Sequence, residues 1–300
     1  MSDLPAALRG LLDSRATISS SVPDAVRRSA DGSVKLRLAL SDGGMVEAMA
    51  LSNGRDRRTA CLSTQVGCPM GCAFCRTGLM GFRRNLEAHE IVEQFLHLGR
   101  EAGPIANVVF MGMGEPLLNL DRVRRAVEIL HHRDGAGLGL RKLTLSTSGV
   151  GSGILELAEK GPAIRLAVSL VSADPAMRAS LMPVCRSTPL PALKEALVRY
   201  QELTGDRITL EIVLLEGKTD RPEDAEALLR FLPPLSAMVN LIPWNPTPDL
   251  PFREPAAERV RLFRARLEEA GVAVAQRFRR GRDLDGACGQ LAVLGRDGGS

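Results

Sequence analysis

Three cysteines stand close together in the segment Cys68-Pro-Met-Gly-Cys72-Ala-Phe-Cys75. Thiolates are soft ligands, so three of them within eight residues favour an iron–sulfur cluster or a zinc ion. A closed structural zinc site needs a fourth ligand at matching spacing, but the nearest histidine, His89, lies fourteen residues beyond Cys75. Three cysteines would instead leave one iron of a [4Fe-4S] cluster open for a small molecule. The spacing therefore favours a [4Fe-4S] cluster over zinc.

The remaining cysteines are Cys61, Cys185 and Cys288. Free cysteine is among the most buried residue types and often only packs in the core. We favour this interpretation for Cys185, which has no recognisable motif around it. Cys288 follows four arginines within residues 277–282, and positive charge favours the nucleophilic thiolate. Cys61 precedes Cys68 by seven residues, and we expect it near the same site.

A second motif, Gly114-Glu115-Pro116, follows an expected strand at residues 107–111. Proline ends the strand, and glycine allows the backbone to approach a ligand closely. Glu115 can accept hydrogen bonds from an ammonium group. In parallel α/β folds the chemistry lies at the carboxyl ends of the strands, so the motif is placed where a ligand is expected.

These motifs fall on a regular alternation of short apolar strands and amphipathic helices. We expect strands at residues 59–65, 107–111, 142–146, 165–171, 207–215 and 238–243. We expect helices at residues 87–100, 121–131, 154–160, 190–203, 222–231 and 255–270. Strict alternation favours parallel βαβ units, and six such units are too few for a closed eight-fold barrel. The predicted fold class is α/β, a partial (βα)6 barrel resembling part of a TIM barrel.

The first part of the chain does not follow this alternation. Residues 1–30 look helical or loosely structured, and a β-hairpin is expected from residues 35–40 and 45–51, which Ser-Asp-Gly-Gly joins. We therefore predict a short N-terminal extension of helix plus β-hairpin over residues 1–58. The catalytic domain is predicted to span residues 59–300.

The composition of the 300 residues is that of a soluble globular protein, with 45% apolar and 25% charged residues. The chain starts with acidic residues and no long apolar run, so we see no signal peptide. No stretch approaches the roughly 20 apolar residues of a membrane-spanning helix. We expect a cytoplasmic protein with no membrane contact.

The net charge of +4 is unevenly distributed, because residues 51–84 hold six arginines and one aspartate. Such clustering is expected for a phosphate-rich partner, with a solvated charged surface as the plainer alternative. Aromatic residues make up only 3% of the chain. This argues against an RNA-binding platform of stacked aromatic side chains.

The cysteine spacing, Phe74 before the last of the three cysteines and the Gly-Glu-Pro motif resemble the radical S-adenosylmethionine (SAM) superfamily. In that superfamily the open iron of the cluster binds the amino and carboxylate groups of SAM. Further segments resemble the RlmN/Cfr family of RNA adenine methyltransferases, with a shortened N-terminal region. These segments are CLSTQVGC at residues 61–68, GFRRNL at 81–86, GMGEPLLN at 112–119, STSGV at 146–150, NLIPWNP at 240–246 and ACGQL at 287–291.

The resemblance implies roles for individual residues. The three clustered cysteines would hold the [4Fe-4S] cluster. Cys288 would carry a methyl group as S-methylcysteine, Cys61 would form a transient disulfide with it, and Glu47 would accept a proton. The implied SAM-binding residues are Gly114, Glu115, Ser146, Ser169, Leu170, Val171 and Asn245, with Val171 at a position where the family commonly has histidine.

The resemblance also implies the reaction, which is methylation of an adenosine ring carbon in ribosomal or transfer RNA, with C2 favoured and C8 as the alternative. An external electron donor such as flavodoxin is expected, and the protein is expected to be a monomer. Two other functions stay open. One is a radical SAM enzyme with a non-RNA substrate, in which Cys61 and Cys288 only pack. The other is a non-enzymatic, metal-containing RNA-binding module, for which the metal is zinc.

Overall fold

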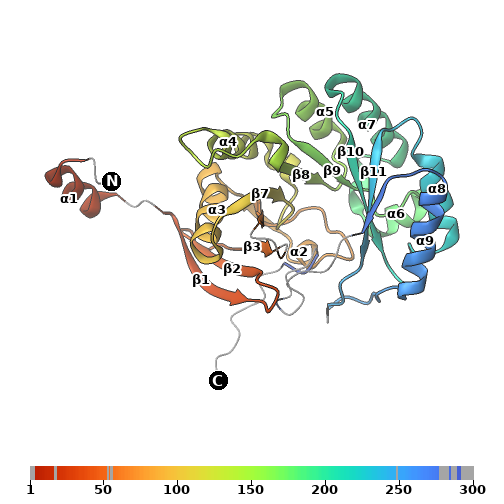
Figure 1. Ribbon diagram of the computed structural model, residues 1–300, viewed down its shortest axis with the longest axis horizontal. Helices are drawn as coiled ribbons and strands as arrows, with labels where there is room; N and C mark the ends of the chain where they lie inside the picture. Colours follow the sequence, from red (N-terminus) through yellow and green to blue (C-terminus); the bar gives the residue numbers. More distant parts are fainter. Residues whose placement is uncertain are drawn as a thin grey trace.

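Figure 1 shows the computed structural model, which describes residues 4–16, 19–52, 54, 57–247, 249–276, 284 and 289–291. Among these residues, a ten-stranded sheet has the order β1-β2-β3-β4-β7-β8-β9-β10-β11-β12. From β4 to β12 every neighbouring pair of strands is parallel, whereas β1 to β4 pair antiparallel. A partial α/β barrel and an antiparallel extension thus share one sheet.

The elements alternate along the chain as follows. The strands are β1 (Ser21–Arg28), β2 (Val34–Leu40), β3 (Met45–Ser52), β4 (Arg58–Cys61), β5 (Gln65–Gly67), β6 (Phe82–Asn85), β7 (Ile105–Phe110), β8 (Leu143–Thr147), β9 (Arg165–Ser169), β10 (Ile208–Leu214), β11 (Ala237–Pro243) and β12 (Val274–Gln276). The α-helices are α1 (Ala6–Arg15), α2 (Arg76–Leu79), α3 (Ala88–Ala102), α4 (Leu120–His131), α5 (Gly151–Lys160), α6 (Pro175–Leu181), α7 (Leu190–Thr204), α8 (Pro222–Phe231) and α9 (Ala257–Glu269). The short 3-10 helices are η1 (Pro116–Asn119), η2 (Leu140–Lys142) and η3 (Pro183–Arg186).

The predicted partial barrel is confirmed. Each expected strand and helix has a counterpart, from β4 and α3 to β11 and α9. In Figure 1 helices α4, α5, α7, α8 and α9 lie around the outside of the curved parallel sheet, whereas α1 lies apart from it. The sequence analysis missed β12 and α6, which are only three and seven residues long. Such short segments contain too few residues to show a hydrophobic period.

The first predicted strand of the barrel, residues 59–65, is wrong in its second half. β4 ends at Cys61, and Gln65 begins β5, which pairs with β6 in a separate two-stranded sheet. The backbone N–H groups of Thr64 and Gln65 both donate to the carbonyl of Met113. These bonds take the chain out of the sheet after β4 and direct it towards the three clustered cysteines.

The N-terminal region is more regular than expected. The hairpin of residues 35–40 and 45–51 is confirmed as β2 and β3. However, part of residues 1–30 forms strand β1, which pairs with β2. Most side chains of this edge strand are exposed, so it lacks the apolar alternation that reveals a strand in the sequence. Its start is held by Glu93 on α3, whose carboxylate accepts the N–H groups of Ser20 and Ser21, each at 2.8 Å.

The sheet continues across the predicted domain boundary at residue 58, because β3 pairs with β4 along residues 49–52 and 58–61. Leu36 and Leu38 of β2 belong to the same hydrophobic core as the barrel strands. The division into residues 1–58 and 59–300 stays a prediction about folding units. In the described part of the chain, no helix is long and apolar enough to cross a membrane.

Helix α3 positions the chain that leaves β4. It begins with a capping box, in which the Glu90 side chain accepts the N–H of Glu87 at 2.8 Å. On its buried face, the Gln94 amide accepts the N–H of Ser63 at 2.8 Å and donates to the carbonyl of Ser63 at 3.0 Å. The backbone N–H and carbonyl of Ser63 are thereby both hydrogen-bonded to one side chain, which fixes the path of the chain from Cys61 into the next loop.

The continuous sheet predicts that the N-terminal strands unfold together with the barrel. Leu38 is fully buried in β2, so Leu38→Ala should lower the free energy of unfolding by about 2–5 kcal/mol through lost burial and a cavity. Urea denaturation followed by circular dichroism should show one transition that moves as a whole. Val22→Ala on β1, where the side chain is 64% exposed, is the control and should have little effect. Two separate unfolding transitions, only one of which is shifted by Leu38→Ala, would contradict the expectation.

Candidate functional site

The three clustered cysteines lie on residues 68–75, here called the cysteine loop, between β5 and α2. The N–H of Cys68 donates to the carbonyl of Gly81 at 2.8 Å. The N–H of Cys75 donates to the carbonyl of Cys72 at 3.1 Å. The first bond ties the start of the loop to the turn before β6, and the second folds the end of the loop back on Cys72.

The thiols of the cysteine loop are mutually close and shielded from water. Burial, with a smaller contribution from Cys75, raises the pKa of the Cys68 thiol to about 12, although the N–H groups of Met70 and Gly114 hydrogen-bond to the sulfur and act in the opposite direction. Burial likewise raises the pKa of Cys72, and the neighbouring Cys75 and Cys68 add to this effect. Thiols in such surroundings become thiolates when a metal centre binds beside them.

This set of three thiols can serve as the protein ligands of a [4Fe-4S] cluster. Among the described residues, no three His, Cys, Asp or Glu side chains form a group that could hold a metal ion. A four-iron cluster does not need its ligands to converge on one point, because each thiolate binds a different iron. The cysteine loop therefore has the ligands that such a cluster requires from the protein.

A small apolar cluster, separate from the main core, packs against the cysteine loop. Its buried members are Val171, Leu181, Met182, Val184, Leu215, Trp244 and Leu250. The indole N–H of Trp244 donates to the carbonyl of Phe74 at 3.1 Å, and the N–H of Ala73 donates to the carbonyl of Leu181 at 2.9 Å. This packing fixes the loop and keeps water away from its thiols.

Glu115, of the motif after β7, is buried and joins the ends of two strands. One carboxylate oxygen accepts the N–H and the hydroxyl of Ser148, at 2.7 and 2.8 Å. The other accepts the N–H of Leu117 at 3.1 Å. Burial raises the pKa of Glu115, while the hydrogen bonds from Ser148 act in the opposite direction. Ser148, just after β8, is a site residue that the sequence analysis missed, although it lies in the STSGV segment.

Gly114 is required by a close approach within the protein itself. It has a φ of 105°, and an added Cβ would lie 2.6 Å from the Cβ of Gln65. The Gln65 amide in turn accepts the N–H of Glu115 at 2.8 Å. The sequence analysis explained this glycine by the close approach of a ligand. The structure adds a second reason, which is the close approach of Gln65 at the start of β5.

The other residues predicted to bind SAM lie at the carboxyl ends of neighbouring strands. Ser146 is on β8, Ser169 ends β9, and Asn245 follows β11 and is buried. Leu170 and Val171, directly after β9, are fully buried. Val171 has a φ of 64°, the one positive value at a non-glycine position among the described residues. A β-branched residue is strained in this conformation, so its surroundings must hold the turn in place.

The sequence analysis missed a polar row beside Ser169. Glu211 on β10 lies next to Ser169 on β9 and Asn240 on β11 in the register of the sheet. The Asn240 amide donates to the Glu211 carboxylate at 2.7 Å, and both side chains are buried. A charged or amide residue inside an apolar strand segment, as in ITLEIVL and AMVNLIP, is the signal that could have revealed this row.

Cys61 and Glu47 lie on adjacent strands. Cys61 ends β4 and is opposite Met49 of β3, two residues from Glu47. The Glu47 carboxylate pairs with the ammonium group of Lys35 at 2.8 Å, and both side chains are largely buried. The hydroxyl of Ser63 donates to the carbonyl of Glu47 at 2.6 Å. Lys35 was missed, and the observed register, in which Arg37 is opposite Glu47, places it on the same face as Glu47.

Cys288 and residues 277–282 lie outside the described part of the chain. Residues 289–291 are described, and the carbonyl of Gly289 accepts the N–H of Arg76 at 2.9 Å. Arg76 begins α2 directly after the cysteine loop. The backbone that follows Cys288 therefore lies against the end of that loop.

Comparison with known proteins identifies the family. Residues 62–232 match the Radical SAM superfamily. A protein named probable dual-specificity RNA methyltransferase RlmN, from Treponema pallidum, is 47% identical over 97% of this chain and 86% of its own length. A protein of the same name from Moorella thermoacetica is 45% identical over 99% of this chain and 86% of its own length. The chain belongs to the RlmN family of radical SAM enzymes.

A solved structure agrees with this family membership. The crystal structure of a radical SAM methyltransferase from Sphaerobacter thermophilus is 41% identical and has a TM-score of 0.92, over 97% of this chain and 86% of that chain. The family resemblance and the fold expected from the sequence are confirmed. Radical SAM enzymes use a [4Fe-4S] cluster and SAM, so the predicted cofactors are confirmed with the family.

In this RlmN-family chain, the arginines near the cysteine loop give less free positive charge than the sequence suggests. Arg76 is buried and pairs with an aspartate at 2.8 Å. Arg84 pairs with an aspartate at 2.7 Å and a glutamate at 2.8 Å. Arg57 and Arg58 lie at the start of β4, the opposite end of that strand from the loop. Of the arginines described between residues 57 and 84, Arg83 on β6 is the one that combines exposure, at 56%, with proximity to the loop, and its guanidinium makes only a long contact of 3.9 Å with the Asp42 carboxylate while donating to the Asp42 carbonyl at 3.2 Å.

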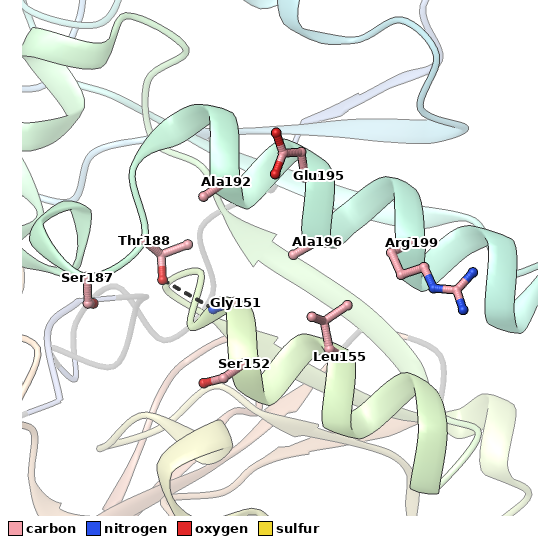
Figure 2. Close-up of a pocket in the computed structure, with 9 residues that line it drawn as sticks. All are labelled: Gly151, Ser152, Leu155, Ser187, Thr188, Ala192, Glu195, Ala196 and Arg199. Atoms are coloured by element: carbon pink, nitrogen blue, oxygen red, sulfur yellow. Dashed lines mark hydrogen bonds between the residues drawn. The ribbon is translucent and has the colours of Figure 1, made fainter.

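A surface pocket between α5 and α7 lies apart from these residues (Figure 2). Its lining residues are Gly151, Ser152, Leu155, Ser187, Thr188, Ala192, Glu195, Ala196 and Arg199. The hydroxyl of Thr188 accepts the N–H of Gly151 at 3.3 Å across it. No residue predicted for the SAM or cluster site lines this pocket, so we do not assign it to either cofactor.

The cysteine loop should depend on Gly67, which has a φ of 77°. A Cβ there would collide with the carbonyl oxygen of Gly81, the same oxygen that accepts the N–H of Cys68. Gly67→Ala should therefore displace Cys68 and lower the iron bound after anaerobic reconstitution, measured per protein chain. The matched control is Gly43→Ala, where φ is 76° and nothing lies within 4 Å of the added Cβ.

The control separates backbone strain from the collision. Both substitutions impose a left-handed conformation on alanine, which costs about 1–2 kcal/mol. The collision arises only at Gly67, so only that variant should lose iron. Equal iron content in the two variants would show that the close approach does not position the loop.

Proposed function

We propose that this protein methylates a ring carbon of an adenosine in ribosomal or transfer RNA, with C2 favoured over C8. The observation that carries the proposal is the meeting of the cysteine loop, Glu115 and the ends of β7 to β9 beside the strands that hold Cys61 and Glu47. RNA as the substrate is supported by the names of the relatives, which are called dual-specificity RNA methyltransferases.

The cysteine loop and the carboxyl ends of the strands provide the residues that would bind the two cofactors. Cys68, Cys72 and Cys75 would hold the cluster, and the residues after β7, β8, β9 and β11 would hold SAM. When bound, the two groups supply a methyl group and a 5′-deoxyadenosyl radical that abstracts hydrogen. This chemistry is needed because a ring carbon of adenine is not nucleophilic enough for ordinary polar methyl transfer.

The remaining steps belong to side chains of this protein. Cys288 would carry the methyl carbon as a thioether and join it to the base, which divides one difficult step into several easier ones. Glu47 would accept the ring proton. Cys61 as thiolate would then attack the sulfur of Cys288, so that a disulfide forms, the bond between that sulfur and the product carbon breaks, and this carbon takes up a proton to become the methyl group. The external electron donor would reduce the disulfide to two thiols before the next turnover.

The surroundings of Glu47 and Cys61 support these roles. The ammonium group of Lys35 holds the buried Glu47 carboxylate in one position at 2.8 Å. Cys61 is buried at the end of β4, where few competing thiols can reach it. The target base must leave its stack to reach such a site, at a cost of a few kcal/mol unless it is already single-stranded.

We further propose that the protein acts as a monomer in the cytoplasm and receives electrons from an external donor such as flavodoxin. The short supply of aromatic residues, 3% of the chain, suggests that a covalent bond and arginine contacts hold the base more than stacking does.

The two-cysteine mechanism separates two variants. Cys288→Ala should abolish methyl loading and lower turnover by several orders of magnitude, because the covalent carrier is gone. Cys61→Ala should instead accumulate an RNA–protein crosslink, since nothing releases the product. Both variants should keep the iron–sulfur absorption of the wild type. The measurements are mass spectrometry of modified adenosine and gel analysis of crosslinked RNA after anaerobic reaction.

The same experiment distinguishes the alternatives. Full turnover of Cys61→Ala would refute the two-cysteine mechanism. SAM cleavage without RNA modification would favour a non-RNA substrate. Zinc in place of iron, with no SAM cleavage, would favour the non-enzymatic RNA-binding module.

RNA affinity should depend on Arg83. Arg83→Ala removes an exposed positive charge beside the cysteine loop, so the slope of log affinity against log salt should fall by about one. Arg133→Ala is the control, because this side chain is 91% exposed and follows α4 at the opposite end of the sheet. Binding is measured by fluorescence anisotropy with an RNA stem-loop. Equal slopes for both variants and the wild type would argue against RNA contact at Arg83.

A further inference from the structure

Arg178 on α6 is the largest of the fully buried side chains. Its guanidinium donates to the carbonyl of Leu170 at 3.0 Å, to the carbonyl of Ser148 at 2.7 Å and to the sulfur of Cys185 at 2.7 Å. Among the described residues it forms no ion pair with a carboxylate. A positive charge in this position is therefore balanced only by partial charges on its immediate partners.

Such a charge is costly unless an anion lies nearby. Moving an ammonium or guanidinium out of water costs several kcal/mol even after the protein relaxes, and burial lowers the pKa of Arg178 accordingly. Hydrogen bonds to carbonyl groups recover part of this cost. The rest calls for a negative group in the same low-dielectric region, where attraction is strong.

The cysteine loop provides that group. Helix α6, which carries Arg178, contacts this loop directly, because the carbonyl of Leu181 on α6 accepts the N–H of Ala73 at 2.9 Å. Cys72 of the loop and Cys185, whose sulfur accepts a hydrogen bond from Arg178, both pack against the small apolar cluster. Arg178 thus faces the cysteine loop across a region that contains little water.

The partners of Arg178 also connect the strand ends. Ser148 follows β8 and holds Glu115 from the end of β7, while Leu170 follows β9 and precedes the strained Val171. One side chain therefore spans two strand ends directly and a third through Ser148. These are the segments to which we assign SAM binding.

We propose that Arg178 is a positioning residue with two linked tasks: it fixes the turns after β8 and β9, and its buried positive charge favours the reduced form of the cluster held by the cysteine loop. A one-electron reduction makes the cluster more negative, so a fixed positive charge nearby stabilises the reduced form and raises the reduction potential. The proposal rests on the cluster being bound by Cys68, Cys72 and Cys75.

The competing explanation is that Arg178 only serves the fold. In that case its charge is balanced by Glu115 through Ser148, and the cluster does not sense it. Neutral replacement would then lower stability without moving the reduction potential. The two explanations therefore differ in the reduction potential of the cluster, which a structural role alone would leave unchanged.

The test uses anaerobically reconstituted full-length protein and a redox titration followed by electron paramagnetic resonance. Arg178→Met and Arg178→Gln remove the charge, and Arg178→Gln keeps a hydrogen-bond donor in case Arg178→Met folds poorly. Arg178→Lys keeps the charge but has a shorter reach for the two carbonyls. Arg186→Met is the control, because Arg186 is exposed and adjacent to Cys185.

The neutral variants should shift the equilibrium between reduced and oxidised cluster at least tenfold towards the oxidised form, which is a fall of about 59 mV in midpoint potential for one electron. Arg178→Lys and Arg186→Met should stay near the wild-type potential. Unchanged potentials in the neutral variants would overturn the proposal. Iron content per chain, measured first, separates this result from failure of the cluster assignment itself, in which case the wild type would bind no iron.

A second readout needs no enzyme activity. Thermal unfolding of the cluster-free and reconstituted forms gives the stabilisation that the cluster confers on each variant. If Arg178 and the cluster attract each other, this stabilisation should be smaller in Arg178→Gln than in the wild type. An equal stabilisation in both proteins would indicate that Arg178 serves only the fold.

Discussion

The site of this protein depends on the burial of charged and polar groups at the carboxyl ends of parallel strands. Glu115 is the clearest case, because a carboxylate out of contact with water must be hydrogen-bonded. Its partners come from its own turn and from Ser148, so the ends of β7 and β8 are tied together. Ser148 then presents its carbonyl to Arg178, which extends the connection to Leu170 after β9. Burial thereby converts three independent loops into one framework.

Two further supports hold the cysteine loop against this framework. The small apolar cluster around Trp244 packs against the loop and excludes water. In addition, the Gln94 side chain of α3 forms two hydrogen bonds with the backbone of Ser63 and so determines how the chain leaves β4. Cys61, the cysteine loop and the Gly114 turn are consequently held by elements that are distant in sequence. A radical reaction requires such fixed surroundings, since mobile C–H and S–H groups would offer competing hydrogen atoms.

Much of this arrangement is visible in the amino-acid sequence, but specific parts of it are not. The cysteine spacing and the Gly-Glu-Pro motif predict the cofactors, and the alternation of apolar segments predicts the barrel. Strand β1 escapes detection because its stability comes from pairing with β2 and from Glu93 on α3, not from an apolar pattern of its own. Arg84 counts as free charge in the sequence, yet its ion pairs with Asp42 and Glu90 form only when β6, the β2–β3 turn and α3 meet. Hydrophobic periods report local burial, whereas these contacts depend on long-range packing.

The sequence by itself determined which chemistry this protein can perform, because ligand type and spacing are properties of short segments such as residues 68–75. Only the tertiary structure decided how that chemistry is held and tuned. The pairs Lys35 with Glu47, Ser148 with Glu115 and Arg178 with Leu170 each join residues from separate elements. Their effects arise from low dielectric and from hydrogen bonds that burial makes obligatory. Neither low dielectric nor burial exists along an unfolded chain, so no local sequence pattern predicts these contacts.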